Sequence, residues 1–116
     1  MYVPFSFAYD EIEESFRTLA EFLGVPAPDF AGKREICDAA LRETAALLAD
    51  TPIAIDYTFC PRPLGLARLL LDAGMQVRRV YLDGISGDEE GDFRYLQQAY
   101  PDLELLPTVH PAMRFC

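Results

Sequence analysis

The stretch that most constrains the fold is DTPIAIDYTFCPRPLGLARLLLDAG, residues 50–74. Its short apolar run IAI, at 53–55, does not alternate with polar residues, which is typical of a parallel-sheet strand covered on both faces. Apolar residues then recur at helical spacing over 63–73, with a proline suited to the first turn and Gly74 suited to the position after the last. The stretch therefore predicts a buried strand, a turn over 58–63 and a helix that is apolar almost all round.

The same pattern continues towards the C-terminus. Residues 77–82 predict a second strand, Asp88 is suited to cap a helix, and 103–106 predict a third strand. Strands that alternate with helices form a parallel sheet with right-handed crossovers. We therefore expect an α/β fold: a Rossmann-like three-layer sandwich with a small parallel sheet, made of two N-terminal helices and then β-α-β-α-β.

The two N-terminal helices are predicted from caps and apolar stripes. The first starts at Asp10, an N-cap residue with Glu13 three positions later, and ends at Gly24. The second runs over 32–49 with an apolar stripe along one side. Cys37 lies beside this stripe, which favours a packed thiol over a ligand.

The length of the chain limits what it can form alone. A chain of 116 residues is enough for one domain with a modest core, so 1–116 is expected to be a single Rossmann-like domain. Three strands leave at least one exposed sheet edge, and no lysine-rich device protects it. We therefore expect the chain to be part of a larger subunit, and an isolated copy to self-associate.

The charge balance excludes some classes of partner. Ten Lys and Arg residues against nineteen Asp and Glu give a net charge of −9, which repels nucleic-acid phosphates and anionic lipid. No apolar run approaches the about 20 residues that span a bilayer. The N-terminal MYVPFSFAYDE has no positive region ahead of an apolar core, so it does not resemble a signal peptide. A cytoplasmic location is the expectation.

The cysteines and the single histidine give weak evidence for chemistry. Cys37, Cys60 and Cys116 form no CxxC pair, and such scattered cysteines are usually free thiols. His110 has no accompanying Ser or Cys nucleophile motif, so a structural or solvated role is favoured over catalysis.

A run of carboxylates precedes the last helix. Asp88, Glu89, Glu90 and Asp92 could suggest a metal site. They also fall on the first helical turn, where acidic side chains interact favourably with the positive end of the helix dipole. We therefore expect solvated residues that stabilise the helix start.

The turn after the first strand is where an α/β protein usually places a ligand. Its sequence FCPRPLGLA has one glycine, Gly65, and two prolines without N–H groups, so it lacks a dinucleotide-binding fingerprint. Cys60 could be activated by the helix N-terminus and Arg62, but Arg62 is better placed as an anion contact that reaches into a crevice. A stand-alone small-ligand or nucleotide-binding module therefore stays open.

These residues also carry a family resemblance. Residues 50–75, with RRVYLDGIS, resemble the middle Rossmann-like domain of nitrogenase component 1 type oxidoreductases, which include molybdenum–iron protein subunits, cofactor scaffold proteins and dark-operative protochlorophyllide reductase subunits. VPFSFAYDEIEESFRTLAEFLGVP resembles the aromatic-rich piece and the ESLRxIAxxxG helix of that family. The most specific local match is Arg62-Pro63 followed by a helix that ends in D-x-G-M, residues 72–75.

The resemblance implies a cofactor-lining role within a larger protein. In molybdenum–iron α subunits the corresponding loop resembles GGLRPR and contacts the metal cluster, which implies cofactor contacts from Phe59, Cys60 and Arg62. Phe59 and Cys60 replace two glycines, and their bulk would block a large cluster, so a divergent homologue is implied rather than a nitrogenase. The family's cluster ligands fall outside 1–116, so no cofactor is expected within this chain. An iron–sulfur or metal–sulfur cluster is expected in the parent protein.

The resemblance also implies partners for the chain. They are the remaining domains of the parent subunit, a homologous partner subunit and an ATP-dependent iron–sulfur reductase. The chain alone is then expected to be inert, a structural and cofactor-lining domain rather than a complete oxidoreductase.

Overall fold

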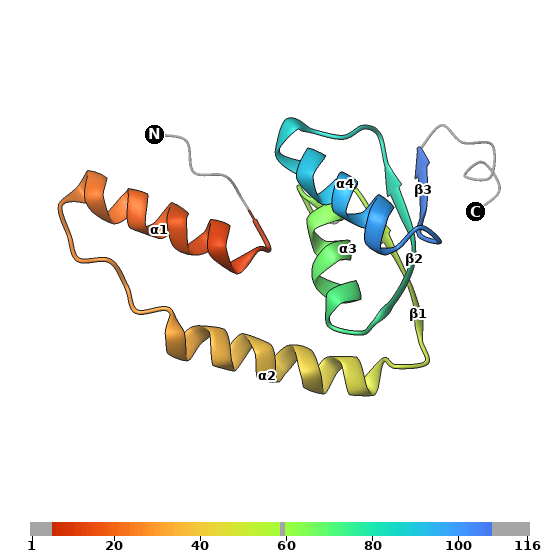
Figure 1. Cartoon of the computed structure of the whole chain (residues 1–116), viewed down its shortest axis with the longest axis horizontal. Helices are drawn as coiled ribbons and strands as arrows, with labels where there is room; N and C mark the ends of the chain where they lie inside the picture. Colours follow the sequence, from red (N-terminus) through yellow and green to blue (C-terminus); the bar gives the residue numbers. More distant parts are fainter. Residues whose placement is uncertain (1–5, 59, 108–116) are drawn as a thin grey trace.

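The computed structural model describes residues 6–58 and 60–107 and shows a mixed α/β fold (Figure 1). Its elements in chain order are α1 (Tyr9–Leu23), α2 (Ala31–Leu47), β1 (Pro52–Asp56), α3 (Pro63–Asp72), β2 (Gln76–Leu82), the 3₁₀ turn η1 (Gly87–Glu89), α4 (Glu90–Ala99) and β3 (Glu104–Pro107). The three strands form one parallel sheet in the order β1-β2-β3. The predicted Rossmann-like α/β class, with two helices ahead of a small parallel sheet, is confirmed.

β2 contains a bulge that sets which side chains face the core. The pairing with β1 is regular up to Val77 and resumes at Arg79, so Arg78 is an extra residue on β2. An extra residue shifts the alternation of side chains by one position. Val77 and Val80, three positions apart, therefore both face the core and both are buried.

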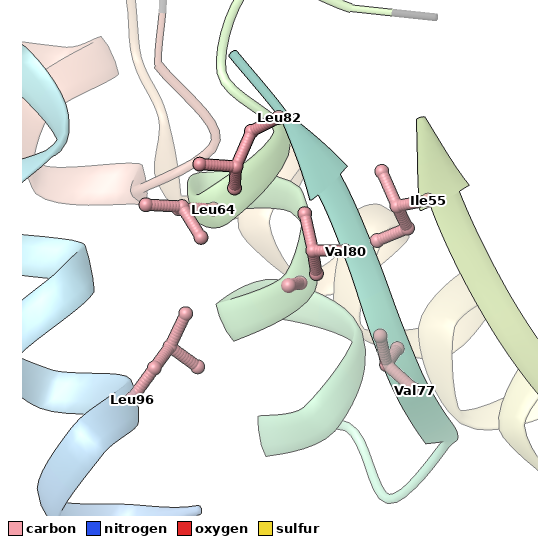
Figure 2. Packing of buried hydrophobic residues seen from close by; sticks show 7 residues of the cluster. Ile55, Leu64, Val77, Val80, Leu82 and Leu96 are labelled. Atoms are coloured by element: carbon pink, nitrogen blue, oxygen red, sulfur yellow. The ribbon is translucent and has the colours of Figure 1, made fainter. Parts of the chain in front are cut away.

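The core lies between one face of the sheet and helices α3 and α4. Leu64 of α3, Val80 of β2 and Leu96 of α4 are each at most 1% exposed, and Figure 2 shows Leu64 and Leu96 on facing helices. The other members of this cluster are Ile55, Ala67, Val77 and Leu82. Full burial of one large apolar side chain contributes about 1.5–3 kcal/mol, so this cluster is the main source of stability in the described residues.

Within residues 6–58 and 60–107, no helix packs on the opposite face of the sheet. The order β1-β2-β3 makes both crossovers run in the same direction, so right-handed connections place α3 and α4 on the same face. On the other face Ala54 and Arg79 are exposed and Tyr81 is half-buried. The expectation that the first strand is covered on both faces is therefore wrong, because Ile55 is buried but Ala54 is not. The described residues accordingly form two layers, a sheet and one layer of helices, instead of the expected three-layer sandwich.

Helices α1 and α2 extend away from the sheet (Figure 1). Of their residues, all of which are described, only Ala20 is buried. The radius of gyration is 16.1 Å, against about 13 Å for a compact domain of this size. The expected packing of the second helix is wrong, because Cys37 is exposed and the Ile36 side chain is 70% exposed.

The helix starts differ from the caps predicted. α1 begins after Ala8 with no side-chain cap, so Asp10 lies in the first turn instead of capping it. Asp88 lies inside η1, and α4 begins two residues later at Glu90. The Asp10 carboxylate accepts a hydrogen bond from Arg34 of α2 over 2.7 Å instead of capping α1.

The predicted helix ends and the proline start are confirmed. Gly24 follows α1 with φ 68°, and Gly74 follows α3 with φ 94°. Glycine adopts this left-handed region without a side-chain clash, which explains both positions. Pro63 occupies the first turn of α3, where no intrahelical N–H bond is lost.

Candidate functional site

The turn between β1 and α3 begins with a local side-chain cap. The Asp56 carboxylate accepts the backbone N–H and the hydroxyl of Thr58, each over 2.8 Å. These two hydrogen bonds hold the pKa of Asp56 below its ordinary value. Phe59 lies outside the described residues, as do His110 and Cys116, so the roles expected of them stay predictions.

Arg62 lies inside a buried cluster of ion pairs. Its Nη1 donates to Glu11 Oε2 of α1 over 2.9 Å, and its Nη2 donates to Asp92 Oδ2 of α4 over 2.8 Å. Nη2 also donates to the carbonyl of Asp88 over 2.7 Å. Burial lowers the pKa of Arg62, but the hydrogen bonds to Glu11 and Asp92 outweigh it and raise the pKa overall.

These contacts change the interpretation of Arg62. Its side chain is 7% exposed and that of Asp92 is 8% exposed. The expectation of a guanidinium that reaches freely into a crevice is therefore wrong, since protein carboxylates engage it. Cofactor contact by the turn as a whole stays a prediction.

Asp92 is shared by two arginines. Its Oδ1 accepts a bond from Arg68 Nη1 over 3.2 Å, and the Arg68 guanidinium carbon lies 3.9 Å from the centroid of the Tyr95 ring. This cation–π contact holds Arg68 against α4. Gly65 permits the close approach, because a Cβ there would lie 3.3 Å from Asp92 Oδ2 and 3.6 Å from the ring of Phe7.

Glu89 caps α3 from a distant part of the chain. Its Oε2 accepts the backbone N–H of Leu64 over 2.9 Å, and its residue is 3% exposed. α3 has no side-chain cap of its own, so this carboxylate satisfies a donor at the positive end of the helix dipole. Burial raises the pKa of Glu89 above its ordinary value.

The solvated role expected for the carboxylates before α4 is therefore wrong for two of them. Glu89 and Asp92 face inward and bind α3. A sequence signal for this exists: Glu89, Asp92 and Leu96 are spaced i, i+3 and i+7, so the two acids share the helix face of a buried leucine. This shared face was not among the predictions made from the sequence.

Glu11 forms the solvent side of the cluster. A hydrogen bond with Ser6, and then the interaction with Arg62, hold the pKa of Glu11 below its ordinary value. Its side chain is 50% exposed, while that of Arg62 is 7% exposed. α1 is thus tied to the core by a contact that water reaches from one side.

Cys60 does not have the environment of a reactive thiol. It is half-buried, and burial raises its pKa, so the thiol stays protonated at neutral pH. Among residues 6–58 and 60–107, no three His, Cys, Asp or Glu side chains gather as metal ligands. The described residues therefore do not fit a metal–sulfur cluster as ligands, although they leave open a lining role for the turn.

A small cavity lies beside the ion-pair cluster, along α3. It has a volume of about 200 Å³ and its lining includes Phe7, Gly65, Arg68 and Asp72. Typical ligand pockets measure about 300–1,000 Å³. The cavity also lies on the flank of the helix rather than beyond the strand ends, so it is not the crevice expected for an α/β ligand site.

The sheet itself lacks the usual crevice. Ligands of open α/β sheets bind where the strand order reverses, because the connections then diverge to opposite faces. The described strands run β1-β2-β3 without a reversal. The turn after β1 can therefore form only one wall of such a crevice.

Comparison with known proteins does not assign the chain to a family. No protein-family model, curated protein or solved structure matches this chain. Within the described part of the chain, none of the helices has the length and apolar character needed to cross a bilayer.

Proposed function

We propose that this chain is a structural, cofactor-lining domain of a nitrogenase component 1-like oxidoreductase and is inert in isolation. The observation that supports this most directly is the strand order β1-β2-β3. Without a reversal the sheet has no crevice of its own, so a cofactor beside the turn after β1 needs walls from other domains. The resemblance over residues 50–75 supports the same conclusion from the sequence.

In this proposal the turn after β1 lines the cofactor cavity, and contacts on the side away from the cofactor hold the start of α3 in place. Arg62 ties the start of α3 to Glu11 and Asp92, so the C-terminal end of the turn is anchored to α1 and α4. The resemblance implies that Phe59 and Cys60 are the positions that contact the cofactor. An iron–sulfur or metal–sulfur cluster is held by ligands on the remaining domains, in a cytoplasmic complex with a homologous subunit and an ATP-dependent iron–sulfur reductase.

The test compares the chain alone with the complex from its source. Both are purified without oxygen, and iron, acid-labile sulfide and the electron paramagnetic resonance spectrum are measured. We expect no iron in the chain alone, and iron and sulfide in the native complex. Cys60→Ala should alter the spectrum of the complex at unchanged iron content, whereas Cys37→Ala, at an exposed position on α2, should not.

Two results would overturn the proposal. One is a native complex without iron or sulfide. The other is saturable binding of a nucleotide by the chain alone that is lost in Arg68→Ala, since Arg68 lines the small cavity. That second result would favour the stand-alone ligand-binding module instead.

A further inference from the structure

We propose that the free edge of β1 binds a second copy of this chain, with the two β1 strands antiparallel about a two-fold axis at Ala54. This inference goes beyond the proposed function and does not depend on it. In the proposed function a strand from another domain would pair with this edge of β1 and complete the crevice. A second copy of the chain would occupy the same edge. Self-pairing is therefore a property of the chain when no other strand covers β1.

The backbone of β1 presents groups at its outer edge that no described strand pairs. Tyr57 N–H donates to the carbonyl of Tyr81 on β2 over 2.8 Å. Successive residues of a parallel ladder turn their N–H and C=O groups to opposite sides. Pro52, Ala54 and Asp56 therefore direct theirs away from β2, and no described strand pairs on that side.

The outward backbone groups of β1 can pair with the same groups of a second copy. About an axis at Ala54, the two Ala54 residues exchange both backbone hydrogen bonds. Each Asp56 N–H then lies opposite the carbonyl of Pro52 in the other copy. Pro52 offers only its carbonyl, which accepts the Asp56 N–H of the other copy, while the Asp56 carbonyl lies opposite a proline and stays exposed to solvent. In a two-fold pair every outward N–H of β1 meets a carbonyl of the other copy, and this match is the ground for a second copy as the occupant.

Electrostatic repulsion favours an axis at Ala54 over an axis one residue further along, at Ile55. An axis at Ile55 would place the Asp56 carboxylates two residues apart along the strands, about 7 Å, which is within the Debye length of about 8–10 Å. An axis at Ala54 separates them by four residues, about 13 Å. Asp56 also turns its carboxylate towards Thr58, and the central side chain is a small alanine that leaves room for a second strand.

The edge has few of the features that block such pairing. β1 has no lysine and no bulge, because the extra residue lies on β2, and its proline is at the first position. The net charge of −9 opposes association of two copies. A two-strand contact also buries less than the about 1,200 Å² of a stable interface, so we expect a weak dimer that strengthens with added salt.

Sedimentation of the full chain tests this, over a range of concentrations and at about 0.05 and 0.5 M salt. We expect a shift from the 13.0 kDa monomer towards a dimer, with tighter association at the higher salt. Ala54→Pro removes the central donor from both copies without removing a bond to β2, and should weaken dimerisation about tenfold or more. Ala54→Val keeps the donor and serves as the matched control.

A second measurement does not depend on whether the proline variant folds. Amide hydrogen exchange of the unmodified chain should slow at Ala54 and Asp56 as concentration rises. A monomer at every concentration and salt would overturn the inference. So would a dimer unaffected by a folded Ala54→Pro chain, or exchange protection confined to the β3 edge at 104–106. None of these results bears on iron content, so this proposal and the proposed function fail separately.

Discussion

Arg62 Nη2 donates to Asp92 Oδ2 over 2.8 Å, and neither side chain is more than 8% exposed. The two residues lie 30 positions apart, one at the start of α3 and the other in the first turn of α4. The same guanidinium reaches Glu11 of α1. One side chain therefore ties the start of α3 to two other elements.

Arg62→Met should destabilise the chain by about 3–5 kcal/mol, because it leaves the buried Asp92 carboxylate without its main partner. Urea unfolding measures this. Arg94→Met is the control: Arg94 pairs with Glu90 over 2.6 Å at an exposed site, so its loss should cost less than about 0.5 kcal/mol. A loss below about 1 kcal/mol for Arg62→Met would show that the cluster contributes little.

Combining Arg62→Met with Asp92→Leu should recover much of the lost stability. The double change removes both buried charges, and apolar replacements of a buried ion pair are often neutral. Arg68 then loses a partner, but its side chain is 40% exposed and water solvates it. If the double variant is as unstable as the sum of the single changes, the two side chains are not coupled.

Glu89→Gln should change how stability depends on pH. Burial raises the folded pKa of Glu89, so the folded state binds this proton more tightly than the unfolded chain. The stability from this carboxyl is full below its ordinary pKa of about 4.3 and is lost as the pH rises through the raised value. Glutamine cannot ionise, and its carbonyl still accepts the Leu64 N–H. The variant should therefore gain stability relative to the native chain as pH rises.

Unfolding in urea from about pH 4 to 8 measures that difference. Glu90→Gln, at an exposed neighbouring position, should show little of it. Glu89→Ala, which also loses the cap of α3, should be destabilised by about 0.5–2 kcal/mol at low pH. A difference between Glu89→Gln and the native chain that falls with rising pH would contradict burial as the cause.

Gly65→Ala should destabilise the chain by about 1 kcal/mol or more, because its Cβ pushes on packed neighbours. The nearest is Asp92 Oδ2 at 3.3 Å, and moving it disturbs both arginine contacts. Gly91→Ala on α4 meets no atom within 4 Å and should stabilise the chain by up to about 1 kcal/mol through helix propensity. Equal gains in thermal stability for the two variants would show that Asp92 moves easily.

Cys60 should react with alkylating reagents more slowly than Cys37. Burial raises the pKa of the Cys60 thiol and reduces access to it, while Cys37 is exposed on α2. Mass spectrometry of peptides after short exposure to iodoacetamide at about pH 8 gives the two rates. Faster labelling of Cys60 would indicate an activated thiol and reopen a nucleophilic role.

The β-α-β part of the fold could be predicted because its signals are local. The apolar run at 53–55, Pro63 and Gly74 each specify backbone conformation within a few residues, and all three are found where expected. The burial of Glu89 and Asp92 could not be predicted in the same way. Their partners on α3 are 25 and 30 positions away, and an acid in a first helical turn is equally suited to solvent.

The helix over 31–47 shows the other limit. An apolar stripe predicts that a helix forms, but it does not say what covers the stripe. Ile36 and Leu47 are 70% and 79% exposed, because the described core is built by α3 and α4 on one face of the sheet. The sequence pattern specifies the helix locally, whereas burial of its apolar stripe depends on the whole fold.

The bulge at Arg78 makes β2 sensitive to the loss of a single codon. With seven residues, both valines turn inward although an odd number of steps separates them. An in-frame deletion of Arg78 would restore strict alternation, and either Val77 would turn to the bare face or the strand would slide along its neighbours. A change that leaves composition and hydrophobicity almost untouched would thus rearrange one end of the sheet.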